Sequence, residues 1–274
     1  MRTFLSGVLT IVAMAAIVLA LPSVWMQLRL VDSAGFDATV APMARNAQVQ
    51  DYLATEISTQ VAQATGVGIS AGLVRPVAQA YTRSDQFPTD FADIVSQQHA
   101  WLFNEPAPGT NTSVMQLDIT SMVNRVIAQQ KLINVTVPGP ILVPLANGSN
   151  GLEAGRYHQV GQQITRIAYA SVVIAVIAGL LALIIARRRG TVLAMLGLGA
   201  VASAAFAWAV ALYFSDRAHT EVDAAGHAAG DATNVVINAL RDDLQHVALI
   251  AGAIGAGVIV VGVVWRMLAG SSSR

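Results

Sequence analysis

The chain of 274 residues contains no cysteine, and only 12% of its residues are charged and 6% aromatic. The absence of cysteine excludes disulfides, thiol catalysis, cysteine-based zinc sites and lipoprotein acylation. It also argues against a small ectodomain stapled by disulfides. Lysine occurs once, at Lys131, and the other basic residues are arginines in a chain rich in Ala, Val and Gly. This composition is typical of a bacterial source with a GC-rich genome.

Charged residues are absent from four long apolar runs, at residues 3–28, 167–186, 191–215 and 247–265. A bilayer core of about 30 Å needs about 20 helical residues, so each run is long enough to cross it. Lipid offers no hydrogen-bond partners to the backbone, and an isolated run must therefore be a helix. We expect a mainly α membrane protein with four transmembrane helices. The first run has an alternative, a cleavable signal peptide over residues 1–20, but its apolar length favours an uncleaved anchor.

The charges outside the runs predict an orientation. The loop at residues 187–190 holds Arg187, Arg188 and Arg189, the tail at residues 266–274 is basic, and Arg2 lies at the head. The positive-inside rule places these three segments in the cytoplasm. Residues 29–166 and 216–246, which carry all sixteen acidic residues, then lie outside. The prediction is a multi-pass protein of the bacterial inner (plasma) membrane with both termini cytoplasmic.

The first outer segment, residues 29–166, is long enough to form one domain. Its periodicity predicts a mostly helical domain with a small two-stranded β element. The expected elements are helices over residues 32–45 (broken near Pro42), 46–64, 69–82 and 90–104 (capped by Thr89), a strand over 114–119, a helix from Thr120, an edge strand within 135–145, and a helix from about Leu152 into the second span. For the second outer segment, residues 216–246, we expect a helical hairpin in which the two flanking spans continue. The tip of this hairpin is expected at residues 224–230.

Small residues recur at close-packing intervals in the third and fourth spans. Such spacing lets two helices approach closely. The candidate residues are Gly197, Gly199, Ser203, Ala248, Gly252, Gly255 and Ala256. The small residues are more numerous than packing within a four-helix bundle requires. Two interpretations therefore stay open. One is packing of the third span against the fourth, and the other is docking against another integral membrane protein.

Chemistry-bearing residues are sparse. No run contains Asp, Glu, Lys, Arg or His, although transporters and channels usually place such a residue at mid-membrane. The three arginines at 187–189 are explained by orientation, with contact to lipid headgroups as a by-product. We therefore predict no catalytic residue, no cofactor, no bound metal and no nucleic-acid partner.

Two clusters could contradict that prediction. The densest acid and base residues are Asp85, Asp90, Asp93 and His99, for which a solvated helix face is the favoured interpretation. His219, Asp223, His227 and Asp231 recur every four residues and would share a face of a continuous helix. Glycines interrupt that segment, which favours a solvated polar tip over a metal site.

The chain resembles a family of actinobacterial four-pass integral membrane proteins with a large outer domain between the first two spans. The residues that carry the resemblance lie at 32–44, 49–57, 87–102 (with His99 and Trp101), 114–126 and 235–244. The resemblance implies no assigned activity and no catalytic residue. The topology is also similar to that of claudins, although the claudin signature of a tryptophan and paired cysteines is absent.

Three functions follow as hypotheses. The first is a non-enzymatic accessory or scaffold subunit of an inner-membrane envelope complex that handles lipids. Proteins of this build resemble accessory subunits of the mycobacterial mammalian-cell-entry type lipid importer. The second is a membrane-anchored sensor that binds a lipid or another ligand in an apolar cavity of the outer domain. The third is an envelope enzyme that uses the acid and base residues named above.

Overall fold

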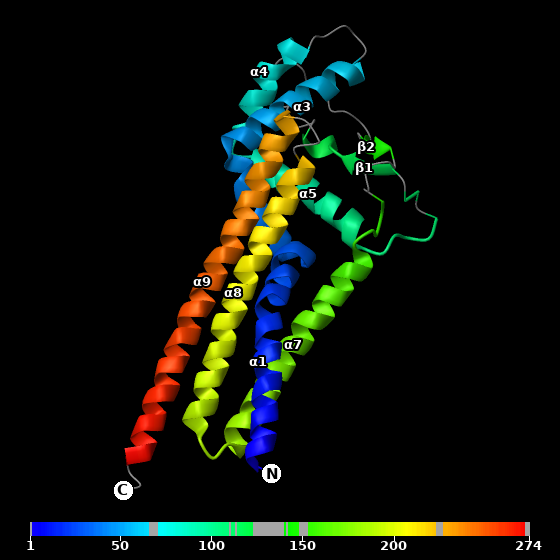
Figure 1. Cartoon of the computed structure of the whole chain (residues 1–274). Helices are drawn as coiled ribbons and strands as arrows, with labels where there is room; N and C mark the ends of the chain where they lie inside the picture. The colour runs from blue at the N-terminus through cyan, green and yellow to red at the C-terminus, as the bar shows by residue number, and fades with distance from the viewer. Residues whose placement is uncertain are drawn as a thin grey trace. The chain divides into compact units, whose positions relative to one another are not determined.

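The computed structural model describes residues 2–65, 71–109, 111–112, 114–122, 140, 142–147, 153–222 and 227–271 (Figure 1). These residues form two compact units. The first unit comprises Met1–Leu30, Gln162–His219 and Ile237–Arg274, and the second comprises Val31–Gly161 and Thr220–Val236. Two expected features, most of the helix that begins at Thr120 and the start of the hairpin tip at residues 224–226, lie outside the described residues.

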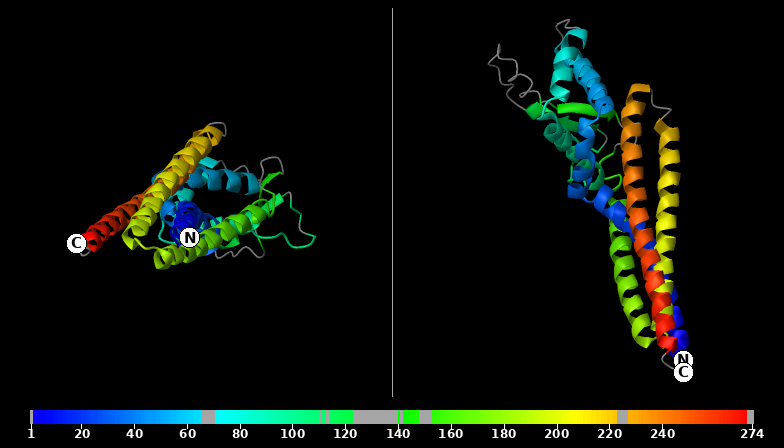
Figure 2. Two further views of the ribbon diagram at one scale, coloured as in Figure 1. Left: turned by 60° about the horizontal axis from the view of Figure 1, so that its bottom comes forward. Right: turned by 90° about the vertical axis from the view of Figure 1, so that its left-hand side faces the viewer.

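In the described part of the chain, four helices are long and apolar enough to span a membrane, which is consistent with a multi-pass membrane protein. They are α1 (Arg2–Met26, continued by the π-helical turn η1, Gln27–Val31), α7 (His158–Ile185), α8 (Arg189–Val222) and α9 (His227–Ser271). Four such helices confirm the prediction drawn from the uncharged runs. The start of α1 and the end of α9 lie at the same end of the first unit (Figure 2).

Helices α8 and α9 run antiparallel and contact each other through glycines seven residues apart. A Cβ placed on Gly197 would lie 2.7 Å from the carbonyl oxygen of Gly255, and one on Gly190 would lie 2.6 Å from that of Gly262. No side chain fits in either place. The seven-residue interval keeps one face of each helix on the seam, as in a coiled coil, and glycine there brings the two backbones together.

Helix α1 packs beside α8 and α7 through small residues and hydroxyl groups. The Ser203 hydroxyl on α8 donates to the carbonyl oxygen of Ile17 at 2.8 Å, and the Ser6 hydroxyl donates to that of Ala182 on α7 at 3.3 Å. Thr10 bonds within α1 to the carbonyl oxygen of Ser6 at 2.7 Å. These hydroxyls therefore have hydrogen-bond partners within the helices, as burial in an apolar environment requires.

Within its described residues, the second unit has five short helical elements and one two-stranded antiparallel sheet. The helical elements are α2 (Ser33–Val40), the 3-10 turn η2 (Ala41–Arg45), α3 (Ala47–Thr65), α4 (Ala71–Thr82) and α5 (Phe87–Phe103). Strands β1 (Val114–Asp118) and β2 (Leu142–Asn147) pair antiparallel, with Gln116 opposite Pro144. The core consists of Ala44, Tyr81, Phe87 and Met122. This composition confirms the expectation of a mostly helical segment with two strands.

Two predicted helix starts were wrong. Helix α5 begins at Phe87 rather than at Asp90, because Pro88 occupies its first turn, where proline fits and no backbone N–H is needed. Helix α7 begins at His158 rather than near Leu152. The residues before it instead cap α5: the N–H of Gly155 donates to the carbonyl oxygen of Trp101 at 2.8 Å, and that of Tyr157 to Leu102 at 2.9 Å. These bonds satisfy carbonyls that the end of a helix leaves free.

The α8–α9 seam generates a first prediction from two glycines on α9. A Cβ on Gly255 would lie 2.9 Å from Ala200 Cβ and from two backbone atoms, whereas no described atom lies within 4 Å of one on Gly257. Gly255→Ala should therefore lower the free energy of unfolding by about 1–3 kcal/mol through overpacking. Gly257→Ala should be neutral or stabilising by up to about 1 kcal/mol. Thermal unfolding of the full chain in detergent measures the effect of both substitutions. Equal unfolding midpoints for the two variants would contradict the close packing of α8 against α9 at Gly255.

The cap on α5 generates a second prediction. Gly155 has φ +70° and Gly109 has φ +86°, conformations that L side chains rarely adopt. A Cβ on Gly155 would also lie 2.7 Å from Pro106 Cδ, whereas none of the described atoms lies within 4 Å of one on Gly109. Gly109→Ala should cost about 1–2 kcal/mol of backbone strain alone. Gly155→Ala should lower the free energy of unfolding by about 1–3 kcal/mol more than Gly109→Ala does, because of the added overpacking. A smaller loss of unfolding free energy for Gly155→Ala than for Gly109→Ala would contradict the observed packing.

Candidate helix-packing and partner-docking surface

Four of the seven predicted small residues lie between α8 and α9. Gly197 and Gly255 face each other across the seam, and a Cβ on Gly252 would lie 3.3 Å from Ala204 Cβ. Ala248 is 1% exposed and belongs to the core of the first unit with Trp25 and Leu244. The third and fourth apolar helices thus pack on each other through these residues.

Two more of the predicted residues contact α1 instead. A Cβ on Gly199 would lie 3.2 Å from Met14 Cγ and 3.3 Å from its Cα. Ser203, 2% exposed, donates its hydroxyl hydrogen to the carbonyl oxygen of Ile17. The small residues of α8 therefore form two faces, one for α9 and one for α1.

The seventh residue, Ala256, points away from the other described helices. It is exposed together with Ala253 and Gly257, which lie on the same side of α9. Large apolar side chains flank them, with Ile254 62% exposed and Val260 60% exposed. We define Ala253, Ala256 and Gly257 as the open small-residue face of α9. Such a face allows the close approach of another helix.

The three arginines lie in and next to the short turn that joins α7 to α8. Arg187, Arg188 and Arg189 are all exposed. Gly190, directly after them, is buried, and a Cβ there would lie 2.9 Å from the backbone nitrogen of Arg266 on α9. We call this end of the first unit, with residues 186–190 and 262–271, the arginine end.

At the opposite end, sequence reasoning missed a cluster of three side chains. The indole N–H of Trp25 donates to Asp243 Oδ2 at 2.7 Å, and the Arg29 guanidinium contacts the same carboxylate, with Nε 3.2 Å from Oδ2. Trp25 is 8% exposed and part of the core of the first unit. The four-residue interval between Trp25 and Arg29 was the available signal, since it places both on one helical face.

A second polar contact ties α1 to α7 near the same end. The Thr165 hydroxyl donates to Gln27 Oε1 at 2.6 Å. Gln27 and Arg29 both belong to the π-helical turn η1, so this turn carries one partner for α7 and one for α9. Polar side chains therefore hold the helices together at the end where the apolar runs finish.

The four acid and base residues of the enzyme hypothesis do not form one site. Asp90 was expected to be solvated but is 3% exposed, and it accepts a hydrogen bond of 2.6 Å from the Tyr81 hydroxyl. His99 is 5% exposed, and its ring stacks on Phe103 and lies tilted against Phe36, with centroids 4.6 Å apart in both cases. Asp85 and Asp93 are exposed. Asp90 and His99 thus lie in packed surroundings, away from solvent.

Two pKa values in the second unit are shifted by their surroundings. Burial raises the pKa of Tyr52, and the negative charge of Glu56 raises it further. The Thr120 hydroxyl and its backbone N–H both donate to the Asp118 carboxylate and lower the pKa of that group. The Thr120 bonds to Asp118 cap the turn that follows β1, and neither shift marks a reactive group.

The structure provides no support for a metal site in the parts of the chain that it describes. Within these parts, no three His, Asp or Glu side chains lie close enough to hold an ion. The predicted series of His219, Asp223, His227 and Asp231 is divided between the end of α8 at Val222 and the start of α9 at His227. Those four side chains lie outside what the structure describes.

Comparisons with known proteins give no relative. No family model matches the chain, and no curated protein or solved structure shows significant similarity to it. The interpretation of function therefore depends on the residues described above.

The cluster of Trp25, Arg29 and Asp243 generates a third prediction, which compares the coupling energies of two ion pairs. Asp243 and Arg29 have side chains 33% and 37% exposed, whereas Asp51 and Arg83 in the second unit are 51% and 60% exposed. A double-mutant cycle of Arg29→Gln with Asp243→Asn should give a coupling energy of about 0.5–1 kcal/mol, because partial exposure screens the pair. The matched cycle of Arg83→Gln with Asp51→Asn should give about 0–0.3 kcal/mol. A larger coupling for the exposed pair would contradict the assignment of the cluster as the tighter contact.

Proposed function

We propose that this chain is a non-enzymatic accessory or scaffold subunit of a larger membrane complex. It docks to another integral membrane protein through the open small-residue face of α9. The observation that carries the proposal is the division of the small residues. Gly252 and Gly255 of α9 pack against α8, and Gly197 of α8 packs against α9, whereas Ala253, Ala256 and Gly257 are exposed.

The chemistry of the four helices supports a docking role over transport. The uncharged runs contain no Asp, Glu, Lys, Arg or His, and hydroxyls within them, such as those of Ser6, Thr10 and Ser203, hydrogen-bond to the backbone. Solute pathways through membranes usually need ionisable groups or broken helices at mid-depth. Association of helices in lipid needs neither, because close van der Waals packing between small residues stabilises it.

The location of the complex is part of the proposal. Arg187, Arg188 and Arg189 favour a cytoplasmic arginine end, with residues 29–166 and 216–246 outside the inner membrane. The resemblance to actinobacterial four-pass proteins suggests an envelope complex that handles lipids, such as an importer of the mammalian-cell-entry type. In such an assembly other subunits supply the permease and the ATPase.

A fourth prediction tests the docking face with a matched control. Gly257 on α9 and Gly7 on α1 are both exposed, and no described atom lies within 4 Å of a Cβ on either. Leucine should therefore fit at both positions without disturbing the chain itself. Gly257→Leu should reduce the amount of partner that co-purifies by about tenfold, the cost of about 1.4 kcal/mol of lost packing. Gly7→Leu should leave it unchanged.

The measurement is affinity purification of the full chain from its own membranes in mild detergent, with the partner quantified by mass spectrometry. Because the chain has no native cysteine, single cysteines at Ala253 and at Gly7 give a crosslinking test of the same contact. Crosslinks from Ala253→Cys alone support the proposal. A lone monomer without a stoichiometric partner, or equal loss in both leucine variants, would overturn it.

A further inference from the structure

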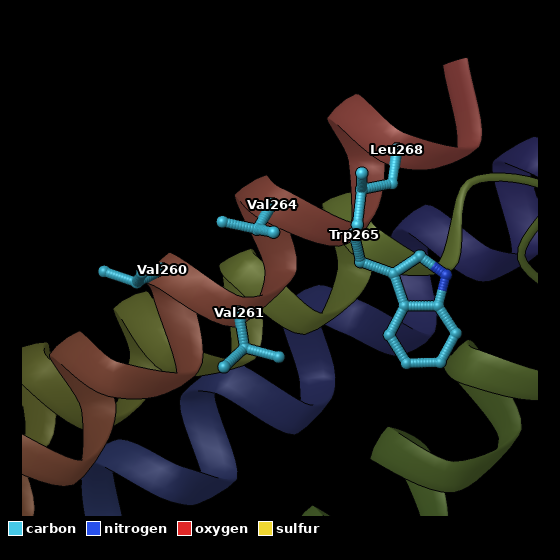
Figure 3. Close-up of a pocket in the computed structure, with 5 residues that line it drawn as sticks. All are labelled: Val260, Val261, Val264, Trp265 and Leu268. Atoms are coloured by element: carbon cyan, nitrogen blue, oxygen red, sulfur yellow. The ribbon is translucent and has the colours of Figure 1, made fainter. Parts of the chain in front are cut away.

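An apolar hollow lies on α9 at the arginine end. Val260, Val261, Val264, Trp265 and Leu268 line it, and its volume is about 470 Å³ (Figure 3). Trp265 is 56% exposed and Leu268 69% exposed, so the hollow opens outward from the helix.

Arginines lie at this end of the helix. Arg266 follows Trp265 directly and is exposed. The backbone nitrogen of Arg266 would lie 2.9 Å from a Cβ on Gly190, so this part of α9 lies against the start of α8, next to Arg187–Arg189. Residues 185–190 and 260–271 contain no Asp or Glu. Four arginines without a carboxylate among them create a positive potential beside the apolar hollow.

We propose that the arginine end binds one anionic phospholipid. An acyl chain occupies the hollow, and the headgroup phosphate is held by Arg266 with the arginines at 187–189. Arginine is suited to this contact because its planar guanidinium donates paired hydrogen bonds to phosphate oxygens. Basic residues beside an apolar surface at a membrane boundary are the arrangement that recognises acidic lipids.

A phospholipid is the occupant that both observations require. A soluble anion would use the arginines and leave the hollow unexplained, and a neutral hydrocarbon would use the hollow alone. Orientation in the membrane accounts for Arg187–Arg189, but it accounts for neither the hollow nor its position beside Arg266. The proposed docking uses a different stretch of α9, at Ala253, Ala256 and Gly257, and the two surfaces meet at Val260.

Three variants separate a defined site from general attraction to a charged bilayer. Val261→Phe fills the hollow and leaves every charge in place. Arg266→Gln removes one cation and leaves the three arginines of the loop, and hence the orientation signal, intact. Arg166→Gln removes an exposed cation on α7 at the opposite end, where it serves as the matched control.

The experiment is native mass spectrometry of the full chain, exchanged into mixed micelles with dioleoylphosphatidylglycerol or dioleoylphosphatidylcholine. The unaltered protein should retain one phosphatidylglycerol per chain in preference to phosphatidylcholine. Arg266→Gln should reduce retention by about fivefold, the effect expected for one arginine near an anionic surface. Val261→Phe should also reduce retention, because its ring fills the space of the acyl chain. Arg166→Gln should retain the lipid fully.

A second measurement remains informative if Val261→Phe unfolds. Brominated phosphatidylglycerol quenches tryptophan fluorescence at contact, and the difference between the unaltered chain and Trp265→Phe isolates Trp265. Quenching of this difference by the brominated anionic lipid, and its loss in Arg266→Gln, support the site. Equal retention of both lipids, or retention unaffected by both Val261→Phe and Arg266→Gln, would overturn the proposal.

Discussion

The close approach of α8 and α9 is the contact on which the first unit depends. At Gly190, Gly197, Gly255 and Gly262 the two backbones meet where a single methyl group would not fit. Lipid is as apolar as leucine, so burying leucine against leucine gains little there, and helices associate through dense packing. Glycine supplies that density, and its seven-residue repeat maintains it along the length of the seam.

With this seam in place, the remaining surfaces acquire different roles. Gly199 and Ser203 on α8 are turned toward α1, where one contacts Met14 and the other donates to a backbone carbonyl. At the end opposite the arginines, Asp243 holds Trp25 and Arg29, and Thr165 holds Gln27. Packing of small residues thus organises the apolar length of the helices, and polar side chains fix one end.

The proposed functions use what the seam leaves uncovered. Ala253, Ala256 and Gly257 form a narrow flat strip between exposed branched side chains, a shape that suits another helix. The hollow near Trp265 combines an apolar floor with nearby cations, a combination that suits an acidic lipid. A scaffold subunit anchored by lipid at one end and by a partner along α9 has no need of a reactive site. The burial of Asp90 and His99 in packed surroundings is in keeping with that role.

The order and type of the elements followed from local patterns. Uncharged runs predicted all four long helices, because lipid permits no other isolated structure. Apolar periodicity predicted α3 and α4, and alternation predicted β1, because side-chain direction follows the backbone repeat. Helix starts were less predictable. Pro88 began α5 one turn early, and the turn before His158 bonded to α5 instead of continuing α7.

The use of the small residues depended on long-range packing. Spacing identified Gly252, Gly255 and Ala256 of α9 equally well, yet the first two face α8 and the third is exposed. A repeat of four residues shows that a helix has a close-packing face, but α9 carries several such repeats around its axis. The rotation of α9 about that axis, set by contacts with residues some 50 positions away in sequence, selects the covered face. The position of Trp25 also depends on a distant contact, because its hydrogen-bond partner Asp243 lies 218 residues away in sequence. Local composition therefore predicts which segments enter the membrane, whereas pairing between distant segments determines which of their faces remain free to bind.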